Sequence, residues 1–137
     1  MSDKRKRDEI PLESAITASI QRWLNKQPCW WGFKVAGGGA QMRGVPDIVG
    51  CWRGVFVGLE VKRPEVGHVS ELQKHRIEQI RDAGGVAEVV YSLDDVKRVC
   101  EALDGCERIW DVCPMITAEV ASPLEWLAAH SRAGEGD

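Results

Sequence analysis

The sequence predicts an α/β domain in which a small mixed β-sheet is flanked by helices. Apolar residues recur at helical spacing in three segments, and the four short runs between them are rich in β-branched and aromatic residues, as strands are. The expected order is helix, strand, strand, strand, helix, strand, helix. Helices before and after a single sheet form an α/β sandwich.

The first helix is expected over about residues 11–25, where apolar residues from Leu12 to Leu24 recur at helical spacing and Pro11 suits the first turn. A strand over 30–35 should follow, and the glycines at 37–39 break the chain into a loop.

The next two strands are expected at 47–52 and 55–62, joined by a tight turn at Arg53-Gly54. A helix over 70–83 begins with the capping-box spacing of Ser70 and Gln73 and ends at a glycine pair. It leads to a strand at 86–91 and a last helix capped by Ser92. If the strands on either side of the helix are parallel neighbours, the connection is a βαβ crossover.

Length and composition indicate one domain at 10–103, between a charged arm at 1–9 and a C-terminal extension at 104–137. The extension should hold a short helix at about 123–131 and end in disorder. No apolar run is long enough to span a membrane, and the charged first residues, which lack an apolar stretch, are not expected to act as a secretory signal. Five cysteines at irregular spacing argue for a reducing, cytoplasmic setting.

Charge is distributed unevenly along the chain. Residues 1–100 carry 16 Lys and Arg against 13 Asp and Glu, whereas residues 101–137 carry 2 against 8. The positive balance of the first part permits a nucleic-acid partner, although it is equally consistent with an ordinary solvated surface.

The stretch from Gly44 to Lys62 contains the main candidate site residues. Glu60 and Lys62 are two residues apart in a predicted strand, so they share one face, and Asp47 comes from the neighbouring strand. On this face the strand starts apolar and ends charged, as a strand leaving a core for a cleft would. Two carboxylates and an ammonium could hold a divalent metal and a phosphodiester. The alternative is an ion pair on a solvated strand.

Two further polar residues lie on or near apolar helix faces. Gln73 shares its face with Ile77 and Ile80, so it either caps its helix or points toward the edge that holds Glu60. Glu13 either stabilises the helix dipole or joins the same site.

The order of these residues resembles the PD-(D/E)XK nuclease superfamily, and most closely its VRR-NUC (virus-type replication-repair nuclease) domains. The resemblance covers about residues 10–100. Its motifs are Glu13-Ser-Ala-Ile, Gly32-Phe-Lys34, Gly44-Val-Pro-Asp47, Gly58-Leu-Glu60-Val-Lys62-Arg-Pro, Gln73 and Gly84-Gly85.

The resemblance implies a restriction-endonuclease-like core and metal-dependent hydrolysis of phosphodiesters. Asp47 and Glu60 are hard oxygen ligands suited to Mg²⁺ or Mn²⁺, and the main-chain carbonyl of Val61 could add a ligand. Lys62 would orient the attacking water or offset charge on the phosphate. Glu13 would reach the metal through water or help to bind a second ion, and Gln73 would orient the site. The expected phosphate contacts are Lys34, Arg43, Arg63 and Lys74.

These inferences predict an endonuclease acting on branched, flapped or four-way DNA in phage or bacterial replication, repair or recombination. The resemblance implies a homodimer. The alternatives are a nucleic-acid-binding module without catalysis and an accessory protein that docks a partner. An iron–sulfur cluster on Cys29, Cys100, Cys106 and Cys113 is disfavoured, because their spacing lacks a C-x₂-C pair.

Overall fold

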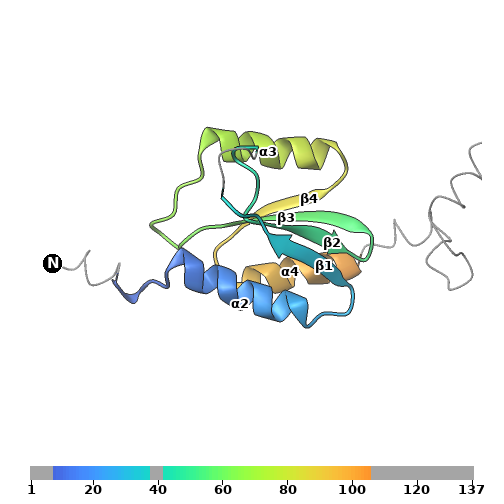
Figure 1. The fold of residues 1–137 in the computed structure, drawn as a ribbon, viewed down its shortest axis with the longest axis horizontal. Coiled ribbons are helices and arrows are strands. Elements are labelled where there is room, and N and C mark those ends of the chain that lie inside the picture. The colour runs from blue at the N-terminus through green and yellow to red at the C-terminus, as the bar shows by residue number, and fades with distance from the viewer. Residues whose placement is uncertain (1–7, 38–41, 106–137) are drawn as a thin grey trace, which may run out of the picture. The chain divides into compact units, whose positions relative to one another are not determined.

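The computed structural model describes residues 8–37 and 42–105. The elements follow the predicted order, and their ends differ from the expected ones by no more than two residues (Figure 1). They are α2 (Glu13–Asn25), β1 (Trp30–Lys34), β2 (Ile48–Trp52), β3 (Val55–Val61), α3 (Glu71–Asp82), β4 (Val86–Val90) and α4 (Leu93–Asp104). The predicted helix at 123–131 and the terminal segments lie outside the described residues.

The four strands form one mixed sheet in the order β1-β2-β3-β4. β1 pairs with β2, and β2 with β3, in antiparallel fashion through short connections. β3 and β4 are parallel neighbours joined through α3, so the predicted βαβ crossover is confirmed. The register pairs Ile48 with Leu59 and Val61 with Val90. The end of β3 therefore lies between the start of β2 and the end of β4.

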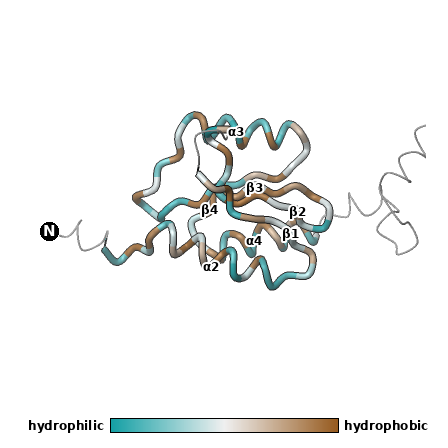
Figure 2. The backbone as a smooth tube through the Cα atoms, in the orientation of Figure 1, coloured by the Kyte–Doolittle hydropathy of each residue, from teal (hydrophilic) through white to brown (hydrophobic). Residues whose placement is uncertain are grey.

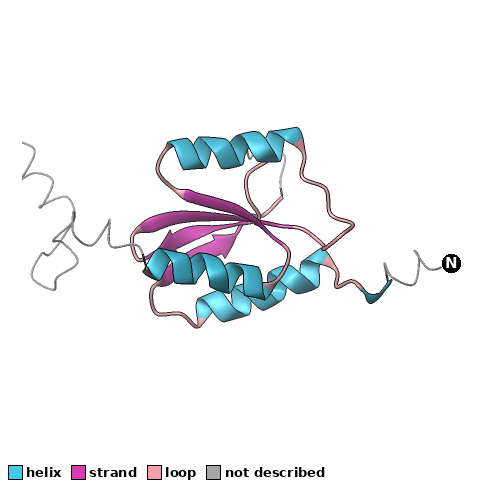
Figure 3. Cartoon of the chain, turned by 180° about the vertical axis from the view of Figure 1, so that it is seen from behind, coloured by secondary structure: helices cyan, strands magenta, loops and turns pink. Residues whose placement is uncertain are grey.

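Helices cover the two faces of the sheet unequally. α2 and α4 lie on one face and α3 on the other, as the views from opposite sides show (Figures 1 and 3). The main core is formed by α2, α4 and the face of β3 that carries Val57, Leu59 and Val61, where Ile20 and Val96 are fully buried. The hydrophobic residues concentrate on the central strands (Figure 2). The predicted alternation of β3 is confirmed.

Tryptophan packing on the core face of β1 and β2 requires glycine. A Cβ atom added at Gly32 or Gly50 would overlap the Trp30 ring, and at Gly50 it would also meet the Trp31 carbonyl oxygen. Nearby, the Trp23 and Trp52 rings stack with centroids 6.2 Å apart. The missing side chains of the two strands therefore make room for an indole that closes this end of the core.

None of the described helices is both long and apolar enough to cross a membrane.

We predict that Gly50→Ala destabilises the protein by about 1–3 kcal/mol, because the added methyl group overpacks a buried site. Urea denaturation should show a lower midpoint with an unchanged slope. Gly37→Ala is the matched control, since a Cβ there meets nothing within 4 Å. Equal midpoints for both variants would contradict this account of the packing.

Candidate active site

The sheet register brings Asp47 and Glu60 together. Asp47 directly precedes β2, and Glu60 is the penultimate residue of β3. Continuing the Ile48–Leu59 pairing by one residue places the two carboxylates beside each other. Asp47 is fixed on both sides: its Oδ2 accepts a 2.8 Å hydrogen bond from the Val61 N–H, and its main-chain oxygen accepts one of 2.8 Å from Val35 N–H. Asp47 thus links β3 to the end of β1.

Glu60 is enclosed rather than exposed at the sheet edge. Its exposed fraction is 1%. Gln73 Nε2 donates a 2.7 Å hydrogen bond to Glu60 Oε1, and Lys62 Nζ lies 3.5 Å from the same oxygen. The expectation that the strand runs out of the core into a cleft is therefore wrong for Glu60, because α3 brings Gln73 over it. The alternative of an ion pair on a solvated strand is excluded by the same burial.

The site holds more negative charge than the Lys62 ammonium can neutralise. The pKa of Glu60 is raised from 4.5 to about 8, mainly by burial and also by the nearby negative charge of Asp47, and the Lys62 ammonium offsets only part of the effect. The two carboxyl groups also interact by a hydrogen bond that favours the protonated form. A bound cation would take the place of the proton, because two adjacent buried carboxylates need a compensating charge to ionise together.

Gln73 satisfies both roles considered from the sequence. Its Oε1 accepts a 2.9 Å hydrogen bond from Ser70 N–H, while its own N–H donates to Ser70 Oγ at 3.1 Å, completing the capping box of α3. The other end of the amide donates to Glu60. The start of α3 therefore holds the amide in one orientation, with its NH₂ group toward the carboxylate.

The main-chain carbonyl of Val61 is directed to the same side as Asp47. In a strand the N–H and C=O of one residue point to the same neighbour, and Val61 N–H points to Asp47. The next N–H along β3, that of Lys62, bonds Val90 of β4 instead. Continuing the register of β2 places Pro46 opposite Val61. Because proline has no N–H, Pro46 cannot donate a β-sheet hydrogen bond to the Val61 carbonyl.

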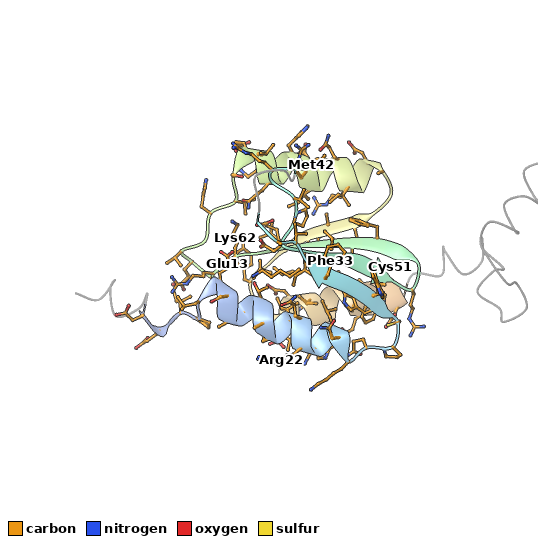
Figure 4. The ribbon with its side chains drawn as sticks, in the orientation of Figure 1. Glu13, Arg22, Phe33, Met42, Cys51 and Lys62 are labelled. Carbon is orange, nitrogen blue, oxygen red and sulfur yellow. The ribbon has the colours of Figure 1, made fainter. Side chains whose placement is uncertain are left out.

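Glu13 and Lys62 line one hollow together with Arg63 and residues 65–68. They come from the start of α2 and the end of β3, and their side chains lie at the same end of the domain (Figure 4). The structure thus places Glu13 on the Lys62 side of the site. Its carboxylate is exposed.

Lys34 and Arg43 line a second hollow, which includes Asp47, Gly44 and Val45. Both side chains are exposed. Lys74 lies elsewhere, on the outside of α3, where it pairs with Glu71 at 3.1 Å. Of the predicted phosphate contacts, Lys34 and Arg43 therefore share a hollow with Asp47, and Arg63 shares the other hollow with Glu13.

Arg63 has a structural role that the sequence did not reveal. Its Nε donates to the Pro11 carbonyl at 3.0 Å, and its Nη2 donates to the Ile10 carbonyl at 2.9 Å. These contacts tie the segment before α2 to the residue that follows Lys62, which sets the position of Glu13. The partners are more than 50 residues apart, so local sequence patterns carry no signal for them.

Among residues 8–37 and 42–105, no group of three or more His, Cys, Asp or Glu side chains could hold a metal ion. A cation here would need oxygen ligands other than side chains, such as a main-chain carbonyl, water or phosphate. Mg²⁺ suits this arrangement, because it commonly uses one or two carboxylates and retains several waters. Cys29, Cys51 and Cys100 are not joined by disulfides, and Cys106 and Cys113 lie outside the described residues.

No family model matches the sequence, and no curated protein matches it. Among solved structures, the chain is similar to a "VRR_NUC domain protein", with 18% identity over 68% of this chain and 85% of that chain, at a TM-score of 0.49.

Glu60 should make the stability of the metal-free protein depend on pH. Its carboxyl group holds a proton in the folded state up to about pH 8 but loses it near pH 4.5 when unfolded. The resulting stabilisation is fully present below pH 4.5 and is lost as the pH rises toward 8. Urea unfolding in EDTA should therefore show that the wild type loses stability relative to Glu60→Gln across this range. Parallel curves for the two proteins would contradict the raised pKa.

Arg63→Lys should behave like Arg63→Ala, because lysine keeps the charge but cannot make the two-point contact with the Ile10 and Pro11 carbonyls. We expect both variants to lose about 1.5–3 kcal/mol of stability, and the amides of the first turn of α2 to exchange faster with solvent. Lys74→Ala, which removes an exposed ion pair, should cost less than about 1 kcal/mol. If Arg63→Lys had the stability and the amide exchange of the wild type, Arg63 would not position the start of α2.

Proposed function

We propose that this protein is an endonuclease that uses Mg²⁺ or Mn²⁺ to hydrolyse DNA phosphodiester bonds. The observation that carries the proposal is the buried Glu60 carboxylate, held beside Asp47 and contacted by Gln73 and Lys62. Burying two acids together is unfavourable unless a cation or a proton compensates them, so such a pair is expected at functional sites rather than for stability alone.

The donor set fits a hard divalent cation. Asp47, Glu60 and the carbonyl of Val61 offer oxygen atoms, and Cys29, Cys51 and Cys100 belong to no metal-binding cluster among the described residues. When bound, the metal would supply Lewis-acid activation of the phosphodiester and lower the pKa of water beside it. Burial around Glu60 would strengthen these electrostatic effects, because little water screens them.

The protein groups around the carboxylates have separate tasks. Lys62 lies between Glu60 and the hollow that Glu13 lines, so its ammonium can donate to a phosphate oxygen entering from that side. Gln73 keeps the Glu60 carboxylate in one orientation, and the Val61 N–H does the same for Asp47. Glu13 would help to hold water or a second cation at the rim of the hollow.

Hollows on two sides of the carboxylate pair support a polymeric substrate that passes across the site. One is lined by Lys34, Arg43 and Asp47, and the other by Glu13, Lys62 and Arg63. We propose branched, flapped or four-way DNA as the substrate class, in replication, repair or recombination of phage or bacterial DNA, and a homodimer as the active form, so that two sites can act on two strands.

We predict that the purified protein cuts nicked, flapped or four-way DNA with Mg²⁺ or Mn²⁺ and that EDTA stops the reaction. Asp47→Asn should abolish cutting while the protein stays folded. Gln73→Ala should reduce activity roughly 10–100-fold and raise the metal concentration required, because Glu60 loses its orienting donor.

Arg98→Ala is the control for these variants, since Arg98 pairs with Asp95 on α4 at the opposite face of the sheet. It should cut like the wild type. If the wild type leaves the whole DNA panel intact with either metal, the proposal is wrong. DNA binding that persists without metal and survives Asp47→Asn would then indicate a binding module.

A further inference from the structure

β1 is an edge strand that exposes two aromatic side chains. Trp31 is 72% exposed and Phe33 53% exposed, and their rings meet edge to face with centroids 5.9 Å apart. Residues two apart in a strand point to the same face, so the pair forms one surface. Two adjacent aromatic rings exposed to this degree form an apolar surface in contact with water, and such surfaces commonly mark a binding site.

The sheet register locates this surface. Trp31 pairs with Cys51, which pairs with Phe56, and Phe33 pairs with Val49, which pairs with Gly58. Gly58 faces Ile80 of α3, so all these residues lie on the α3 face of the sheet. α3 contacts β3 and β4 and leaves the β1 side of this face open. We call Trp31 and Phe33 the β1 aromatic pair.

The surroundings of the β1 aromatic pair favour an anionic partner. β1 and β2 contain no acidic residue. Val35 is two residues after Phe33 and on the same face, and it lines the hollow that contains Arg43 and Asp47. From Trp31 to Val35 is about 13 Å along the chain. The aromatic rings therefore lead along one face of the sheet to Arg43 and the candidate catalytic carboxylates.

We propose that the β1 aromatic pair binds unpaired bases of a single-stranded segment of the substrate, with Arg43 contacting the backbone on its way to Asp47 and Glu60. The proposal rests on the proposed nuclease function and specifies its substrate class. Aromatic side chains stack on bases only where the base faces are free, which in a duplex they are not. Trp31, the more exposed ring, stacks on a base, and Phe33 supports it through the edge-to-face contact.

The test is binding of a fluorescent oligo-dT strand and of a blunt duplex to the full-length protein in EDTA, followed by fluorescence anisotropy. Trp31→Ala and Phe33→Ala should each weaken single-strand binding roughly 5- to 150-fold and leave duplex binding nearly unchanged. Trp31→Tyr is the matched control, because it keeps a ring that can stack, and it should bind nearly as the wild type does. Circular dichroism should show unchanged folding, since both rings are exposed.

Unchanged single-strand binding in both alanine variants would overturn the proposal. So would a loss of self-association in sedimentation without any change in oligonucleotide binding, which would make this surface a protein interface. Cleavage is a separate readout. If the wild type cuts no DNA but the alanine variants lose single-strand binding, the nuclease function fails and the aromatic site stands. If cleavage occurs and the variants bind normally, only the aromatic site fails.

Discussion

The buried carboxylate of Glu60 is the group on which this end of the domain depends. Placing it almost out of contact with water beside Asp47 is unfavourable, and the structure compensates with a 2.7 Å hydrogen bond from Gln73 and the nearby Lys62 ammonium. Each compensating group comes from a defined element: Gln73 from the first turn of α3, and Lys62 from the residue after β3. The capping of α3 and the pairing of β2 with β3 are therefore also constraints on the site.

The two faces of the sheet have different tasks. The face toward α2 and α4 holds the main apolar core, and its packing is tight enough that Gly32 and Gly50 must lack side chains beside Trp30. The α3 face is covered only in part. Over β3, α3 approaches closely enough for a Cβ added at Gly58 to lie 3.3 Å from the Ile80 side chain. This approach closes the site around Glu60, while the β1 side of the same face stays open.

This unequal cover explains how a small domain can combine an enclosed acid pair with an accessible surface. The acids need exclusion of water, which α3 provides at the end of β3 by placing Gln73 over Glu60. A polymeric partner needs contact area, which the edge strand β1 and the two hollows beside the acids provide. Arg63 holds the start of α2 against the residues that follow β3, through its hydrogen bonds to the Ile10 and Pro11 carbonyls. It thereby keeps the hollow lined by Glu13 beside the acids.

The sequence by itself determined the order of elements, the two faces of β3 and the proximity of Asp47 to Glu60. These follow from periodicity, from glycine and proline punctuation, and from strand alternation, all of which are local properties. It also limited Gln73 to two roles. Only the tertiary structure showed that one amide fills both, because a capping residue can reach Glu60 only when α3 lies over β3. Burial of Glu60, the contact of Arg63 with Ile10 and Pro11, and the exposure of Trp31 were likewise decided by packing, since each depends on which distant segment covers a residue and which leaves it open.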